Sequence, residues 1–188
     1  GWGNVSVASA PRHPKYEGRS IADLAAAAGA DPVDLVAELL IAEEAAVTIV
    51  HKSMSLEDNR ATLAWSHTMV GSDGIPTPGK PHPRWAGSFV RMLGRYGRAE
   101  RLVGMTDAVR KMTSLPAARF RLEGRGVLRE GAAADVAVFD PVTVTDRATY
   151  TEPLLPPAGV RHVVVGGMAV VLDGEPTGAA PGRVLLAE

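Results

Sequence analysis

The chain has 188 residues, of which 46% are hydrophobic, enough for one sizeable domain or for one and a half. Its 20 lysines and arginines nearly balance 21 aspartates and glutamates, which argues against a nucleic-acid-binding protein or a binder of anionic membranes. No apolar run approaches the roughly 18 residues that cross a bilayer, the opening Gly1-Trp2-Gly3-Asn4 is unlike a signal peptide, and without cysteine there are no disulfides or thiolate ligands. We therefore expect a cytoplasmic protein.

Two capped helices are predicted first. Ser20 is a good N-cap residue, Asp23 completes a capping box, and Gly29 ends the helix. Asp31 caps a second helix that has Pro32 at its first position, and the apolar residues that follow recur at helical spacing.

The next segment predicts a strand–helix–strand repeat. Residues 47–50 are all β-branched and predict a buried strand, a helix runs from Ser55 to about Trp65, and residues 68–71 predict the next strand. This order implies parallel strands joined by a right-handed crossover. Helical patterning resumes over residues 88–96 and 106–113.

After Arg119, glycine and proline become frequent and helix signals vanish. The Gly166-Gly167 pair predicts a hairpin turn between two strands. The predicted strands are residues 134–139, 160–165, 168–172 and 182–186. We therefore predict two domains, residues 1–120 and a small β domain of residues 121–188.

The most informative motif is Gly71-Ser72-Asp73-Gly74, at the end of the predicted strand 68–71. A carboxylate beside glycines at the mouth of a buried parallel strand is typical of a catalytic acid. Arg84 follows in a loop rich in proline and glycine, where its guanidinium could clamp a carboxylate over the same mouth. From the residues alone, the alternative to a catalytic site is that Asp73 only forms a turn and Arg84 is a solvated loop residue.

Several segments together resemble the C-terminal portion of the N-acyl-D-amino-acid deacylases (D-aminoacylases) of the amidohydrolase superfamily. They are residues 18–25, 69–74, 82–84, 109–117, 126–141 and 177–183. The likeness covers nearly the whole chain, and the Ser-Asp-Gly and His-Pro-Arg motifs point most narrowly to this family. It implies an α/β fold, in which residues 1–120 form the last two βα units of a TIM barrel and residues 121–188 a small β-sandwich.

The resemblance also implies a reaction, which is zinc-dependent hydrolysis of the amide bond of an N-acyl-D-amino acid. Asp73 would act as general base and then as general acid, and it is also a candidate ligand of a second metal site. Arg84 would bind the substrate carboxylate, with Ser72 and His82 as further substrate-binding residues. His51 and Lys52 are lesser candidates, because they follow a predicted barrel strand.

The main metal ligands of the family are absent from this chain, which has neither cysteine nor a His-x-His motif. We therefore expect the zinc centre to lie upstream of Gly1, and the isolated chain to bind no catalytic zinc and to be inactive. Two barrel strands leave open edges, so we expect pairing with a missing N-terminal barrel segment or self-association. The alternatives are a non-catalytic structural module and another amidohydrolase, such as a dihydroorotase- or hydantoinase-like enzyme.

Overall fold

The computed structural model describes residues 1–75 and 77–185, which form two compact units. Unit 1 contains Gly1–Ser55, Asp73–Ala86 and Ala148–Leu155. Unit 2 contains Leu56–Ser72, Gly87–Arg147 and the described residues from Pro156 onward. Each unit draws on segments from both sides of residue 120, and the division into domains 1–120 and 121–188 stays a prediction. No helix in the described ranges is long and apolar enough to cross a membrane.

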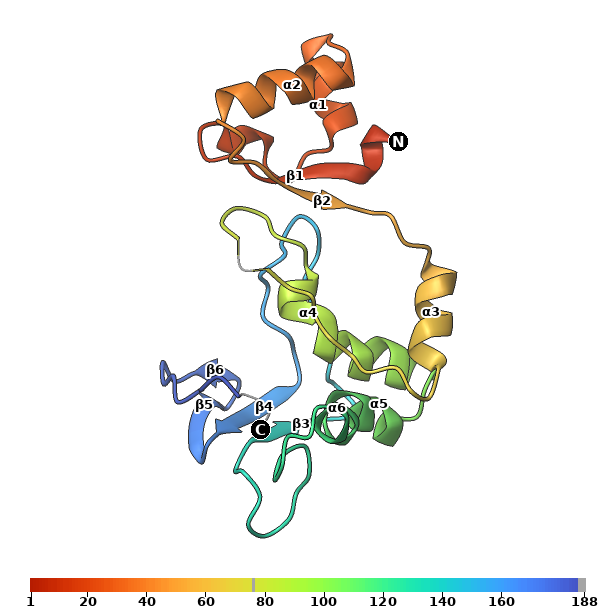
Figure 1. Ribbon diagram of the computed structural model, residues 1–188, viewed down its shortest axis with the longest axis vertical. Coiled ribbons are helices and arrows are strands. Elements are labelled where there is room, and N and C mark those ends of the chain that lie inside the picture. Colours follow the sequence, from red (N-terminus) through yellow and green to blue (C-terminus); the bar gives the residue numbers. More distant parts are fainter. Residues whose placement is uncertain (76, 186–188) are drawn as a thin grey trace. The chain divides into compact units, whose positions relative to one another are not determined.

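Unit 1 is built from a two-stranded antiparallel sheet with two helices over it (Figure 1). Its elements are η1 (Trp2–Asn4), β1 (Val5–Ser9), η2 (Pro14–Tyr16), α1 (Ile21–Ala28), α2 (Pro32–Ala42) and β2 (Thr48–His51). Val7 of β1 is fully buried and packs with Ile21 and Leu24 of α1 and with Leu35 and Leu39 of α2. These contacts make the core of the unit, because the helices bury their apolar faces on the sheet.

The caps predicted for both helices are confirmed. The Ser20 hydroxyl accepts a hydrogen bond from the Asp23 N–H (3.1 Å) and donates one to the Asp23 carboxylate (2.7 Å). Gly29 ends α1 with a φ of 64°, a left-handed conformation that glycine adopts without strain. The Asp31 carboxylate accepts from the Val33 N–H (2.8 Å) at the start of α2.

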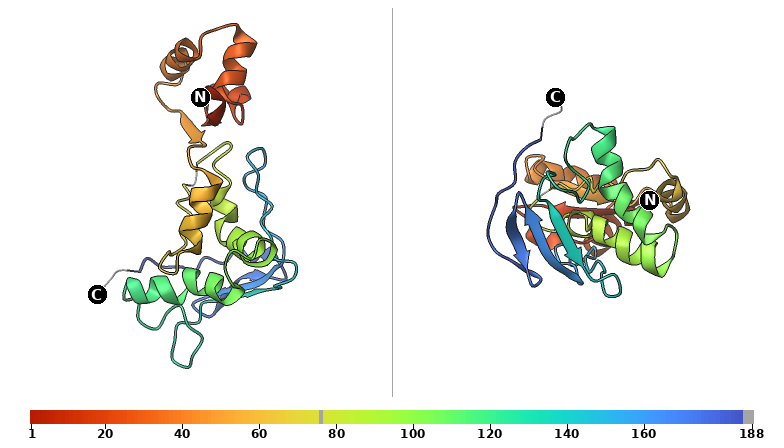
Figure 2. Two further views of the ribbon diagram at one scale, coloured as in Figure 1. Left: turned by 90° about the vertical axis from the view of Figure 1, so that its right-hand side faces the viewer. Right: turned by 90° about the horizontal axis from the view of Figure 1, so that it is seen from below.

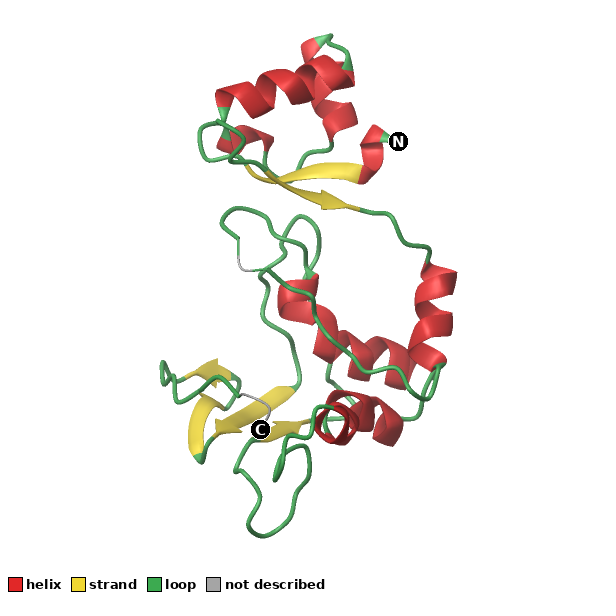
Figure 3. Cartoon of the chain, viewed as in Figure 1, coloured by secondary structure: helices red, strands yellow, loops and turns green. Residues whose placement is uncertain are grey.

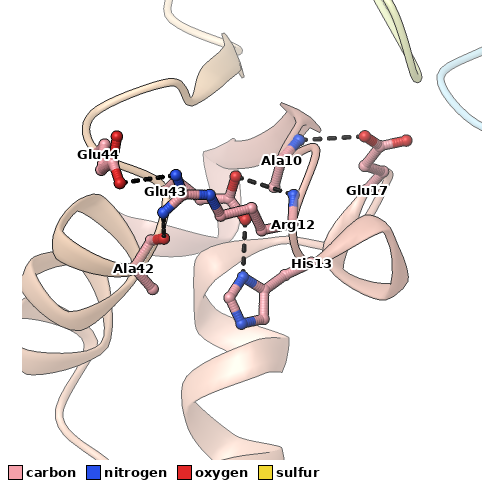
Figure 4. A network of polar contacts seen from close by, with 7 residues as sticks. All are labelled: Ala10, Arg12, His13, Glu17, Ala42, Glu43 and Glu44. Carbon is pink, nitrogen blue, oxygen red and sulfur yellow. Dashed lines mark hydrogen bonds and ion pairs between the residues drawn. The ribbon is translucent and has the colours of Figure 1, made fainter.

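A buried glutamate ties the end of α2 to the loop after β1 (Figure 4). The Glu43 carboxylate accepts a hydrogen bond from the Arg12 N–H (3.0 Å) and lies 2.7 Å from Nδ1 of His13. Burial by itself raises the pKa of Glu43, but these hydrogen bonds and the charge of His13 outweigh it and leave the pKa lowered. The Arg12 guanidinium donates to the Ala42 carbonyl (2.8 Å), so a free carbonyl at the helix end is satisfied.

Unit 2 combines helices with an antiparallel sheet. Its helices are α3 (Leu56–Ala64), most of α4 (Arg84–Arg91), the π-helical η3 (Met92–Ala99), α5 (Met105–Met112) and α6 (Ser114–Arg119). The strands are β3 (Val136–Phe139), β4 (Val160–Val165), β5 (Met168–Leu172) and β6 (Glu175–Pro176), hydrogen-bonded in that order (Figure 2). Gly166 and Gly167 have φ values of 56° and 83°, which confirms the predicted hairpin turn.

The sheet of unit 2 packs on helices. Met92 and Tyr96 of η3 are buried in one cluster with Val144, and Phe139 of β3 and Val160 of β4 pack against it. In the described residues from 121 onward, the strands of the predicted sandwich form a single sheet in the order β3-β4-β5-β6. The expected strand over residues 182–186 is absent from residues 182–185, and residue 186 lies outside the described ranges.

The predicted parallel repeat is wrong for the residues that the structure describes. Residues 68–71 form no strand, and β2 pairs antiparallel with β1, a strand that the sequence analysis did not predict (Figure 3). Lys111 bonds part of the backbone of this segment. Its carbonyl accepts from the Val70 N–H (3.0 Å), and its buried ammonium donates to the carbonyls of Trp65 and Thr68. The Val70 N–H and the Thr68 carbonyl are therefore satisfied without a neighbouring strand.

Candidate functional site

Asp73 lies in the loop between α3 and α4, and its carboxylate is 82% exposed. Its φ is 47°, so the backbone is left-handed at this position. Aspartate tolerates this conformation better than most residues, because its short polar side chain can bond locally. The chain therefore turns at Asp73 and presents the carboxylate at the surface of unit 1.

Arg84 is the first residue of α4, and its guanidinium lies 2.9 Å from the Asp73 carboxylate. The two residues that the sequence analysis singled out are thus in direct contact. The Arg84 side chain is 38% exposed, and partly exposed pairs of this kind contribute at most about 1 kcal/mol. Another carboxylate can therefore replace Asp73 on the guanidinium at small cost.

His82 links this pair to a distant segment of unit 1. It stands between Pro81 and Pro83, both of which are buried. Its Nδ1 accepts a hydrogen bond from the Arg84 N–H (3.0 Å) at the start of the helix. Its Nε2 lies 3.3 Å from the Tyr150 hydroxyl, and the two rings meet edge to face with centroids 5.2 Å apart.

Lys52 completes the cluster from the end of β2, with its ammonium 4.4 Å from the centre of the Tyr150 ring. A cavity of about 350 Å³ is lined by Lys52 and Tyr150 together with Ser6 and Lys80, and Asp73, His82 and Arg84 are not among its lining residues. This volume is in the range of small-molecule sites. Tyr150 was missed from the sequence, because it stands in a loop with no motif around it.

The two remaining predicted residues are Ser72 and His51. Ser72 is half-buried and belongs to unit 2, so its role in substrate binding stays a prediction. His51 is exposed at the end of β2, where its backbone pairs with Val5.

The described residues do not by themselves fit a catalytic metal. Across residues 1–75 and 77–185, no group of three or more histidine, cysteine, aspartate or glutamate side chains could hold an ion. Zinc in enzymes takes about three protein ligands, and Asp73 offers one carboxylate. A metal centre that used Asp73 would need ligands from beyond these residues.

A family model described as "Amidohydrolase family" matches residues 6–171. The chain is 42% identical over 182 residues to an N-acyl-D-glutamate deacylase from Alcaligenes xylosoxydans xylosoxydans, covering 97% of this chain and 36% of that protein. It is 43% identical over 172 residues to a D-aminoacylase from the same organism, covering 92% of this chain and 34% of that protein.

The chain is also similar to a solved structure of a deacylase. The crystal structure of N-acyl-D-glutamate deacylase from Bordetella bronchiseptica, complexed with zinc and a phosphonate inhibitor, matches with a TM-score of 0.82 and 41% identity. The match covers 92% of this chain and 36% of that one, so the chain spans about a third of the length of its relatives. The chain belongs to the amidohydrolase family.

Proposed function

We propose that this chain is the C-terminal part of a longer zinc-dependent enzyme that hydrolyses N-acyl-D-amino acids to a D-amino acid and a carboxylate. The observation that carries the proposal is the 2.9 Å contact between Asp73 and Arg84, a proton-accepting group beside a carboxylate-binding group. The names of the similar deacylases support the substrate class. The TM-score of 0.82 supports a place for this chain in the same larger fold, with the remaining barrel strands supplied from outside it.

Arg84 is the substrate-binding residue in this proposal. Its guanidinium is planar and presents paired donors, which match the two oxygens of a carboxylate. It already holds one carboxylate, that of Asp73, through a weak and partly exposed ion pair. When the substrate carboxylate takes that place, Asp73 is released beside the bound amide.

Asp73 is the proton carrier. Its freed carboxylate accepts a proton from the attacking water and then donates it to the nitrogen of the leaving amine, as a general base that becomes a general acid. When bound, zinc supplies Lewis-acid polarisation and water activation. His82 holds the Arg84 backbone, and Ser72 precedes Asp73 in the loop as a candidate substrate contact.

The test uses a longer protein that contains this chain together with an upstream segment bearing the family's metal ligands. With N-acetyl-D-amino acids as substrates, Asp73→Asn should lower kcat by about 10²- to 10⁴-fold and leave KM nearly unchanged. Asp173→Asn is the matched control, because Asp173 also has a positive φ (52°), is 86% exposed and precedes a glycine.

Three results would contradict the proposal. A normal kcat in Asp73→Asn would remove Asp73 from proton transfer. Turnover of dihydroorotate or a hydantoin, with none of N-acyl-D-amino acids, would favour the other amidohydrolases. Deacylase activity in the 188-residue chain alone would show that no further segment is needed.

A structural, self-associating role is the second candidate. In the described residues, β1 and β2 form a sheet of only two strands. The other edge of β1 is taken by the chain itself, because the Val7 N–H donates to the Arg19 carbonyl (3.0 Å) and the Val7 carbonyl accepts from the Gly18 N–H (2.7 Å), so β2 has the edge without a strand partner. Such edges favour pairing with another chain. Light scattering of the isolated chain tests this, since a concentration-independent monomer mass would reject self-association.

A further inference from the structure

We propose that Tyr150 is a positioning residue for Arg84, acting through His82, and that Lys52 holds the Tyr150 ring in place. The inference rests on the proposed function, in which Arg84 binds the substrate carboxylate. It adds a residue that carries no motif and lies 68 positions from His82 in the chain. All four residues belong to unit 1.

The first step is the geometry of His82. An N–H group can only donate, so Nδ1 of His82 must be the acceptor of the Arg84 N–H. The neutral imidazole then carries its proton on Nε2. The buried prolines on either side restrict the backbone, because each fixes its own φ near −65° and limits the residue before it. His82 is therefore left with its ring torsions as the main freedom.

The second step is the contact that limits those torsions. With the proton on Nε2, His82 donates to the Tyr150 oxygen at 3.3 Å, slightly longer than the usual range. The edge-to-face packing of the two rings adds to this contact. Together they hold the imidazole in the orientation that keeps Nδ1 on the Arg84 N–H.

The third step is the anchoring of Tyr150 itself, whose side chain would otherwise be mobile because the residue is 43% exposed. Its loop is closed by two hydrogen bonds, from the Thr149 N–H to the Glu152 carbonyl (3.1 Å) and from the Glu152 N–H to the Thr149 hydroxyl (2.9 Å). The Lys52 ammonium lies over the ring, well within the distance of a cation–π contact. The Lys52 backbone N–H is in turn bonded to the Asn4 carbonyl (2.9 Å).

These contacts reach Arg84 through its backbone N–H, while its guanidinium pairs with the Asp73 carboxylate. A displaced Arg84 binds the substrate carboxylate less well in the ground state and in the transition state alike. Uniform weakening of this kind raises KM and leaves kcat unchanged. Tyr150 should therefore affect KM, in contrast to Asp73.

The decisive variant is Tyr150→Phe in the longer deacylase, which keeps the ring and removes the hydroxyl. We expect KM for an N-acetyl-D-amino acid to rise about two- to tenfold, the effect of one neutral hydrogen bond, with kcat unchanged. A substrate whose carboxylate is replaced by a neutral amide should show no such rise. Lys52→Met should act in the same direction with a smaller effect, and it also tests the inference should Tyr150→Phe unfold.

Tyr16→Phe is the matched control. Tyr16 lies in the same unit and stacks on His13, with 5.5 Å between the ring centres. The Lys15 ammonium lies 5.4 Å from the centre of the Tyr16 ring. Tyr16→Phe should leave KM unchanged. Equal effects of the two tyrosine variants, or an unchanged KM in Tyr150→Phe, would overturn the inference.

A second measurement on the 188-residue chain separates this inference from the proposed function. Nitrogen-15 NMR should give His82 an unprotonated Nδ1 and a protonated Nε2, and Tyr150→Phe should shift the Nε2 signal. A proton on Nδ1 would overturn the inference whatever the enzyme does. In another outcome, NMR finds the proton on Nε2 while Arg84→Ala leaves KM unchanged. That outcome confirms the contacts of His82 and rejects the proposed binding of the substrate carboxylate by Arg84.

Discussion

Replacing Arg84 by alanine tests whether the guanidinium recognises the substrate or only closes the loop. A charge-assisted hydrogen bond contributes about 1.5–3 kcal/mol, so its loss should lower kcat/KM by about 10- to 150-fold. The lost ion pair with Asp73 adds little, because the Asp73 carboxylate is 82% exposed. The effect should appear mainly in KM, and Arg84→Lys should restore only part of it, since an ammonium lacks the bidentate geometry.

The same helix offers the control for this variant. Arg91 is the last residue of α4, its side chain is 40% exposed, and it pairs with Asp146 at 2.6 Å, so it matches Arg84 in helix, exposure and partner type. Steady-state kinetics should show little change for Arg91→Ala. The second comparison uses a substrate with a neutral amide in place of the carboxylate, on which Arg84→Ala should lose little activity. An equal loss on both substrates would refute the reasoning, because Arg84 would then act on the loop and not on the carboxylate.

Two further predictions concern stability in unit 2. Hydrogen bonds from Arg60 and Arg95 lower the pKa of Glu100 to about 2, so Glu100 stabilises the fold above about pH 4.5 and loses this effect as the pH falls towards about 2. Urea unfolding should therefore show that Glu100→Gln lowers stability at about pH 6 and changes it less at about pH 3. Lys111→Met keeps the buried chain but leaves two carbonyls without their donor, which should cost about 2–4 kcal/mol in the same assay; an unchanged midpoint would contradict this.

The sequence by itself determined the features that depend on neighbouring residues. The caps at Ser20 and Asp31 and the glycine turn between β4 and β5 follow from contacts within three or four positions, which are readable from residue type. The Ser-Asp-Gly and His-Pro-Arg motifs singled out Asp73 and Arg84, and the fold brings these two into contact.

The tertiary structure alone decided how strands pair and what surrounds the site. The β-branched run of β2 predicts a strand, but it fits a parallel or an antiparallel ladder equally well. Its antiparallel pairing with β1 could therefore not be predicted from the sequence. Residues 68–71 read as a strand because nothing local shows that a buried lysine, 43 positions from Thr68, bonds part of their backbone. Tyr150 reaches His82 across 68 positions of chain, and long-range contacts of this kind leave no periodicity or motif in a single sequence.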